Sequence, residues 1–209
     1  MKISDLTIKN LKSGKLSHDL PDFYELKDVI ENNDWHNNES TFDHTLNVLK
    51  NYNNFLKQNK NKKLEKYLNQ KVDSLKRKDL LCLAIIFHDF GKKETLKLDG
   101  KISTFPLHEK ISVLKIKKIL TKLKLSASEK KIVNSVISKH TSLYEMFAFE
   151  NEKLENQFNK IEKASGNYII ELVLLVLNDS LNGYLKVTNP SMYKYRINYY
   201  KERLQELIK

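Results

Sequence analysis

Apolar residues recur at helical spacing along most of this chain. Phe42, Leu46 and Leu49 share one face of a helix that the sequence predicts to begin after Ser40. A serine followed three residues later by an acid, here Asp43, is typical of a capping box at a helix start. Helical patterns also cover residues 23–30, 75–89, 107–125, 126–140, 167–185 and the stretch from 189 onward. The sequence therefore predicts a chain that is mostly helix.

One stretch, residues 94–105, breaks the helical pattern. Leu96 and Leu98 alternate with charged residues, and an Asp-Gly pair at 99–100 follows them. Alternation around Asp-Gly is a hairpin signal, because the turn requires positive φ angles that these residues tolerate. The expected fold class is therefore all-α: a helical bundle with one small β-hairpin at about 94–105.

Length and composition favour one domain with a buried core. The chain has 209 residues, 40% of them hydrophobic, and only five glycines and three prolines. Residues 1–22 are weakly periodic and are expected to form an N-terminal arm, with the domain over 23–209 ending in an amphipathic C-terminal helix. Cys82 is the single cysteine and lies in an apolar run, so a buried thiol is expected rather than a nucleophile. Without possible disulfides, a leader-like segment or a long apolar span, a cytoplasmic protein with no membrane contact is expected.

The formal net charge of +11 favours phosphate-bearing partners. Nearly all of this charge is lysine, however, and the chain is also rich in asparagine and isoleucine. Genome base composition alone can produce such usage. The charge therefore leaves nucleic-acid binding open. The tyrosine-rich last helix offers rings for base stacking, but packing onto the core is the preferred interpretation.

The candidate chemistry begins where an apolar helix ends in two polar residues. The run 80–87 leads directly into His88 and Asp89, and Gly91 and Lys92 follow. Ligands at the end of a buried helix are held rigidly, as a metal site requires. Imidazole and carboxylate together suit Mn, Fe, Ni, Co, Zn or Mg. Gly91 is expected to give a phosphate access to the backbone, and Lys92 to offer charge to a phosphate oxygen.

A second His-Asp pair, His18-Asp19, shows how much the context matters. It has no apolar helix before it and no Gly-Lys after it, so a surface position is expected. His44 lies in the first turn of a predicted helix, where a histidine is more often a hydrogen-bonded helix residue than a ligand. Asp179 interrupts an apolar helix, and a buried acid needs a partner. That partner is a metal, a lysine, an asparagine or a helix terminus.

Together these residues resemble a known family. His44, then His88-Asp89, then Asp179 follow the H…HD…D order of the HD superfamily of metal-dependent phosphohydrolases. Longer stretches look like the HD domain of bacterial CCA-adding tRNA nucleotidyltransferases, over roughly residues 21–185. The stretches that carry this likeness are Trp35-His36…Glu39…His44, His88 to Thr95, Phe105…His108-Glu109 and Leu123 to His140. The nucleotidyltransferase domain has no counterpart here, so the resemblance implies a stand-alone HD protein without CCA-adding activity.

The resemblance implies a set of site residues. His44, His88, Asp89 and Asp179 would hold a first divalent ion, with Asp89 able to bridge to a second one. His108 and His140 match positions that hold that second ion in binuclear members, and the alternative is two surface or capping histidines. One or two ions are therefore expected.

The resemblance also implies catalytic roles for Asp89, Lys92 and His36. Lys92 would bind a non-bridging phosphate oxygen. His36, or His108 if it is not a ligand, would protonate the leaving oxygen. A plain loop histidine is the alternative for His36.

The expected function is that of a metal-dependent phosphohydrolase, either a phosphodiesterase or a phosphatase, acting on a nucleotide or an RNA-end phosphate ester. One alternative is an HD-scaffold binding module that docks RNA or protein without turnover. Another is a hydrolase of free nucleoside mono- or triphosphates, since its metal chemistry would be identical. The oligomeric state is open, and the terminal helix could mediate a homodimer.

Overall fold

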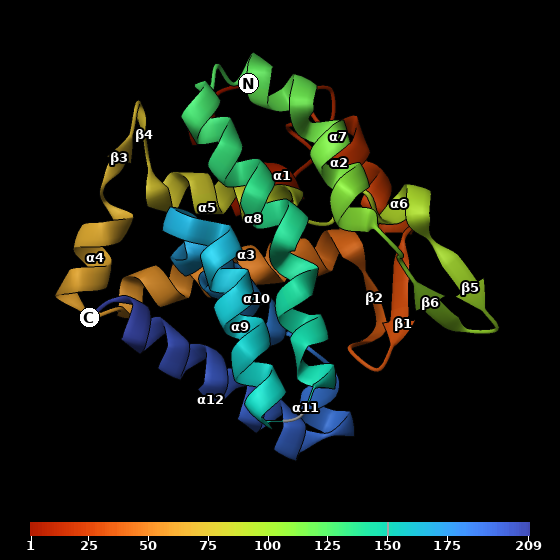
Figure 1. Ribbon diagram of the computed structural model, residues 1–209. Coiled ribbons are helices and arrows are strands. Elements are labelled where there is room, and N and C mark those ends of the chain that lie inside the picture. The colour runs from red at the N-terminus through yellow and green to blue at the C-terminus, as the bar shows by residue number, and fades with distance from the viewer. Residues whose placement is uncertain (150) are drawn as a thin grey trace.

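The computed structural model describes residues 1–149 and 151–209, and it is predominantly helical (Figure 1). The predicted all-α class is confirmed. The helices are α1 (Ile8–Lys12), α2 (Pro21–Glu25), α3 (Thr41–Gln58), α4 (Lys62–Leu68), α5 (Arg77–Phe87), α6 (Lys92–Thr95), α7 (His108–Lys122), α8 (Ala127–Glu145), α9 (Asn151–Ser165), α10 (Ile169–Ser180), α11 (Leu185–Thr188) and α12 (Pro190–Leu207). The strands pair as three antiparallel hairpins: β1 (Ile30–Asn33) with β2 (His36–Ser40), β3 (Lys71–Val72) with β4 (Leu75–Lys76), and β5 (Lys97–Asp99) with β6 (Ile102–Thr104).

Helix α10 forms the centre of the bundle. All of its residues from Ile169 to Asn178 are buried. It contacts α3, α5, α8 and α12, which surround it (Figure 1). A helix that is covered on every side needs no polar face, and this accounts for its nearly continuous apolar sequence. Helix α5 is buried in the same way from Leu83 to Phe87. These two rigid helices end near one another, and each delivers polar residues at its C-terminal end.

The helix start predicted at Ser40 is confirmed, and a second serine caps α8. The Ser40 side chain accepts the Asp43 N–H at the start of α3. At the start of α8, Ser126 and Glu129 satisfy one another's backbone N–H groups. Glu129 also accepts hydrogen bonds from the Ser74 and Leu75 N–H groups, and these tie the β3–β4 turn to α8.

The predicted hairpin is present as β5 and β6, with Gly100 at a φ of +57° in the turn. The sequence interpretation missed the other two hairpins. The helix expected over 23–30 gives way to strand β1, which pairs with β2 and lies beside β6 (Figure 1). The contact between the two hairpins includes a 2.7 Å hydrogen bond from the Asn32 N–H to Ser103 Oγ.

Both ends of the chain pack against the bundle. In residues 1–22, expected as an arm, Leu11, Leu16 and Leu20 are buried in the core, while His18 is exposed as predicted. Helix α12 lies against α10, and the Tyr200 hydroxyl donates to the Leu143 carbonyl at 2.9 Å. The interpretation that this tyrosine-rich helix packs onto the core is therefore confirmed. None of the described helices combines the length and apolarity needed to cross a bilayer.

A buried ion pair links α5 to α10. Arg77 Nη1 donates to Glu171 Oε1 at 2.6 Å, and the Tyr67 hydroxyl donates to the second oxygen, Oε2, at 2.7 Å. Glu171 is fully buried. Because a buried charge without its partner is strongly unfavourable, this pair constrains how the two central helices sit together.

We therefore expect Glu171→Gln to lower the free energy of unfolding by about 3 kcal/mol, because it leaves the Arg77 charge buried and uncompensated. Urea unfolding followed by far-UV circular dichroism measures this. The matched control is Glu65→Gln, whose carboxylate is 55% exposed and pairs only with Lys62, and it should cost less than about 0.5 kcal/mol. Equal effects of the two substitutions would contradict the assignment.

The Cys82 thiol should be unreactive in the native protein. Burial, and to a smaller extent the nearby Asp79, raises its pKa to about 12. Since the thiolate is the nucleophile, we expect alkylation by iodoacetamide at pH 8 to be at least about 100-fold slower in the folded protein than in urea. Mass spectrometry over time follows the reaction, and comparable rates in both states would contradict the placement of Cys82.

Candidate metal centre

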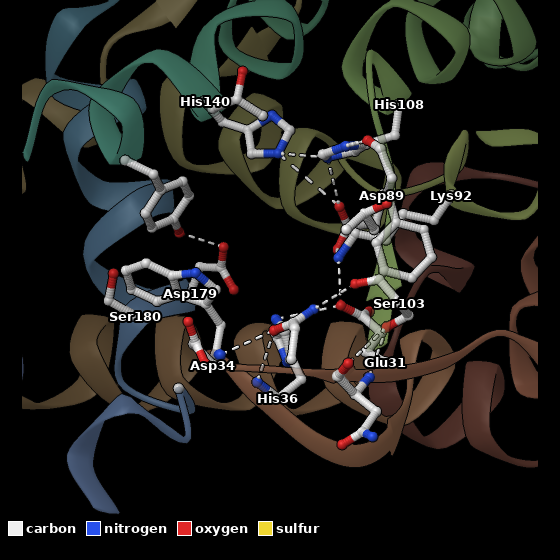
Figure 2. Close-up of a pocket in the computed structure, with 18 of the residues that line it drawn as sticks. Glu31, Asp34, His36, Asp89, Lys92, Ser103, His108, His140, Asp179 and Ser180 are labelled. Carbon is white, nitrogen blue, oxygen red and sulfur yellow. Dashed lines mark hydrogen bonds and ion pairs between the residues drawn. The ribbon is translucent and has the colours of Figure 1, made fainter. Parts of the chain in front are cut away.

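The β1–β2 and β5–β6 hairpins and the ends of several helices surround one large cavity of about 740 Å³. Its inner wall carries titratable side chains from seven elements or their ends, and Figure 2 shows them converging on the same space. The predicted site residues that line it are His36, Asp89, Lys92, His108, His140 and Asp179. His44 and His88 are buried directly behind this wall.

The fold brings the predicted ligands together from distant parts of the sequence. His44 lies in the first turn of α3, and His88 and Asp89 follow the last residue of α5. Asp179 is near the C-terminal end of α10. The two further histidines are His108, the first residue of α7, and His140 on α8.

Three imidazoles of the centre are held by the same backbone contact. The Nδ1 atoms of His88, His108 and His140 lie 2.8, 2.8 and 2.6 Å from the carbonyl oxygen three residues earlier in the chain. A carbonyl can only accept, so Nδ1 must carry the proton and, in the neutral ring, the Nε2 lone pair remains free. His44 differs, since its Nδ1 lies 3.5 Å from Glu39 Oε2. Carbonyls and carboxylates in these positions are typical of histidines that ligate a metal through Nε2.

Asp89 stands between two groups of ligands. Its Oδ2 lies 3.0 Å from His88 Nε2 and 4.0 Å from His44 Nε2. On the same side, Asp179 Oδ1 lies 2.7 Å from His44 Nε2. The other Asp89 oxygen, Oδ1, lies 3.2 Å from His108 Nε2 and 4.0 Å from His140 Nε2. The two oxygens of one carboxylate thus face two separate clusters, as a bridging ligand would.

The charges of the centre stabilise one another despite their burial. Burial opposes ionisation of Asp89 and Asp179, but the adjacent imidazoles, and Lys92 for Asp89, outweigh it and hold both carboxyl pKa values well below their usual range. Burial likewise opposes the charged form of His44, yet Asp179, Glu39 and Glu31 raise its pKa well above the usual value. These pKa shifts are those of the side chains alone, before any cation binds.

His140 behaves in the opposite way. Burial, followed by the charges of His108 and His88, lowers its pKa to about 3, so its imidazole is neutral near pH 7. Its Nε2 nevertheless lies only 3.1 Å from His108 Nε2. With both Nδ1 atoms engaged as donors, two Nε2 lone pairs of neutral rings would face each other at this distance.

The residues present fit a divalent cation. His88 Nε2 and Asp89 Oδ2 are buried and, among the described residues, have no aligned hydrogen-bond partner. Buried polar atoms without an aligned hydrogen bond are unfavourable unless another group satisfies them, and Lys92 compensates only the charge of Asp89. A cation facing His44, His88 and Asp179, and another facing Asp89, His108 and His140, would engage these atoms. Nitrogen and oxygen donors of this kind suit a transition metal or zinc.

Lys92 and Glu31 form the cavity wall beside Asp89. Lys92 Nζ donates to Glu31 Oε2 at 2.7 Å and lies 3.0 Å from Asp89 Oδ2. Both carboxylates outweigh burial and raise the pKa of Lys92, so the ammonium stays charged. The Thr41 hydroxyl donates to the second Glu31 oxygen, Oε1, at 2.7 Å, which fixes the carboxylate.

His36 lies beside Glu31 in the cavity wall, between two acids. Its Nε2 lies 3.3 Å from Glu31 Oε2 and its Nδ1 lies 3.8 Å from Glu39 Oε2. It lines the cavity and packs edge-on against His44. The carboxylates therefore orient an imidazole that is partly open to the space in front of the predicted ligands (Figure 2).

Gly91 serves a packing role that the sequence interpretation did not anticipate. Its backbone lies in the ordinary right-handed helical region, at φ −86° and ψ −4°. A Cβ added there would stand 2.2 Å from the His108 carbonyl oxygen and 2.8 Å from Ser112 N. Gly91 N–H also donates to Ser112 Oγ at 2.8 Å. The absence of a side chain lets α7 approach closely, and that approach places His108 opposite Asp89.

Two acids and one tyrosine of the site escaped the sequence interpretation as site residues. Glu31 was missed because the predicted helix ended at residue 30 and no strand was assigned after it, and Glu39 was noted only as part of a motif. The run Asn32-Asn33-Asp34 is a turn signal that could have revealed the hairpin. Tyr144, whose hydroxyl donates to Asp179 Oδ2, carried no sequence signal.

Comparison with known proteins gives no match that bears on the centre. No protein-family model matches the chain, and no curated protein matches its sequence.

We expect Gly91→Ala to destabilise the protein by about 2 kcal/mol or more, because the added methyl group meets backbone atoms of α7 that cannot yield. Gly91 is the N-cap residue of α6, where glycine is preferred over alanine, so loss of capping has the same sign but is expected to be the smaller effect. Urea unfolding in the presence of a chelator measures the effect. The exposed Ser138→Ala on α8 is the control, expected within about 0.5 kcal/mol of the wild type, and a stabilised Gly91→Ala protein would contradict the close-packing role.

Proposed function

We propose that this protein is a metal-dependent phosphohydrolase that cleaves a phosphate ester. The observation that carries the proposal is the pairing of tethered imidazoles with the two-sided carboxylate of Asp89, at the inner wall of a cavity large enough for a small substrate. The order His44, His88-Asp89, Asp179 adds support, since it resembles that of the HD superfamily.

The ligand set would divide into two halves. His44, His88, Asp89 and Asp179 would hold one divalent ion, and Asp89, His108 and His140 would hold a second. Mn, Fe, Ni, Co, Zn and Mg are the candidate ions. When bound, such an ion polarises a phosphate oxygen and lowers the pKa of water.

The chain's own residues supply the remaining steps. Lys92 directs two contacts to Glu31 and Asp89, which leaves its third N–H for a non-bridging oxygen of the substrate phosphate. Water loses one proton to solvent and adds to phosphorus, and the phosphorus–oxygen ester bond breaks. His36 donates a proton from its ring to the departing oxygen, while Glu31 and Glu39 hold that ring in place. The products are a phosphate and an alcohol.

The test is hydrolysis of p-nitrophenyl phosphate and bis-p-nitrophenyl phosphate with each candidate ion, together with metal analysis of the purified protein. We expect turnover that falls by at least about 1,000-fold in His88→Ala/Asp89→Ala, because the shared ligands are lost. The preferred ester distinguishes a phosphatase from a phosphodiesterase.

The sequence provides a matched control for this double variant. His18→Ala/Asp19→Ala removes the other His-Asp pair, whose histidine is exposed, and should keep wild-type turnover. Absence of metal and of turnover with every ion, in protein that is correctly folded by circular dichroism, would refute the proposed hydrolase.

A further inference from the structure

The outer part of the cavity is acidic although the protein as a whole is basic. Asp34 and Glu145 line it, are exposed, and form no ion pair within the described part of the chain. Lys92 is the only lysine or arginine among the lining residues, and it is already engaged by Glu31 and Asp89. The cavity therefore offers positive charge at its inner end alone, and a second or third phosphate would face carboxylates.

Exposed lysines lie elsewhere on the surface. Residues 107–140, which include α7 and most of α8, contain nine lysines but only two acids, Glu109 and Glu129, both of them buried. None of these lysines lines the cavity. The excess of lysine in the chain thus does not extend to the cavity in which a substrate would bind.

Aromatic rings form the apolar part of the same wall. Trp35, Phe105 and Tyr144 all line the cavity. Tyr144 is fixed by its hydrogen bond to Asp179, and Phe105 lies 5.1 Å from Lys92 Nζ. Trp35 and Tyr144 lie against one another, with ring centroids 6.1 Å apart, and share the cavity wall with Phe105.

Trp35 is held in place from behind. The Arg196 guanidinium lies 4.3 Å from the centre of the indole ring and 4.6 Å from that of Phe147, so it is stacked between the two. The Trp35 carbonyl also accepts the Tyr184 N–H at 2.6 Å. Arg196 does not line the cavity, so the guanidinium backs the ring without occupying the substrate space. A rigid aromatic side chain of this kind binds a flat partner at little entropic cost.

We propose that the substrate is a nucleoside monophosphate, with its single phosphate at the inner end of the cavity and its base stacked on Trp35. This inference rests on the proposed function. Asp34 and Glu145 would accept hydrogen bonds from hydroxyl or amino groups of the nucleoside and would disfavour additional phosphates. Stacking of a base on an aromatic side chain contributes about 1–3 kcal/mol, which corresponds to roughly 5- to 150-fold in affinity.

Binding can be followed without turnover because Trp35 is the only tryptophan of the chain. Chelator-treated protein is titrated with adenosine 5′-monophosphate, ribose 5-phosphate and adenosine 5′-triphosphate. We expect saturable quenching of tryptophan fluorescence by the monophosphate, at least about 10-fold weaker binding of the triphosphate, and no quenching by ribose 5-phosphate. Equal or tighter binding of the triphosphate, or no quenching by the monophosphate, would overturn the substrate assignment.

The values of kcat/KM for two substrates, measured with metal present, distinguish binding of the base from the hydrolytic step. We expect Trp35→Ala to reduce the preference for adenosine 5′-monophosphate over ribose 5-phosphate by at least about 10-fold, and Trp35→Phe to restore most of it. If Trp35 had only a structural role, its substitution would lower kcat/KM for both substrates equally. Phe149→Ala, an exposed aromatic residue that does not line the cavity, is the control and should leave the preference unchanged.

Two further comparisons test the acidic rim. Asp34→Asn/Glu145→Gln should improve use of the triphosphate relative to the monophosphate by at least about 3-fold, because the opposing charge is removed. A short RNA with a terminal phosphate should be used less efficiently than the mononucleotide, and the reverse order would overturn the inference in favour of an RNA end.

If p-nitrophenyl phosphate is hydrolysed but bases confer no preference, the substrate assignment fails while the hydrolase stands. If fluorescence reports base binding without any turnover, the hydrolase fails instead.

Discussion

The hydrogen bonds between the Nδ1 atoms of His88, His108 and His140 and the carbonyl oxygens three residues earlier determine which nitrogen atoms the site can offer to a cation. Each bond uses one ring nitrogen and aims the other into the centre. The backbone carbonyls belong to rigid or closely packed segments, so the direction of each Nε2 lone pair follows from the fold itself. Four imidazoles and two carboxylates gathered in this way form a donor set suited to cations.

Burying so many charges requires that each be compensated. Asp89 and Asp179 are stabilised by imidazoles and Lys92, and Lys92 in turn by Glu31. The continuous apolar packing of α5 and α10 holds these charged side chains in place. Gly91 has a comparable importance, because without its close contact to α7 the second pair of histidines could not face Asp89.

Much of this arrangement could be predicted from the sequence, and the rest depended on contacts between distant segments. Helical periodicity and the serine cap at Ser40 predicted α3, α5, α7, α8, α10 and α12, whereas α4 and α9 were missed. The His-Asp pair after an apolar run pointed to the candidate centre. Strand β1 could not be recognised, since four residues carry little periodicity and its partner was read as a loop. Glu31 was lost with it. The role of Gly91 was also beyond the sequence, because an ordinary φ angle conceals the close approach of another helix.

The central claim is that the free Nε2 atoms and Asp89 form a two-part metal centre. Calorimetric titration of chelator-treated protein with Co²⁺ tests it most directly. The account predicts saturable binding of two ions per chain, reduced to one by His140→Ala. Undetectable binding, or binding that His44→Ala and His140→Ala both leave unchanged, would contradict it.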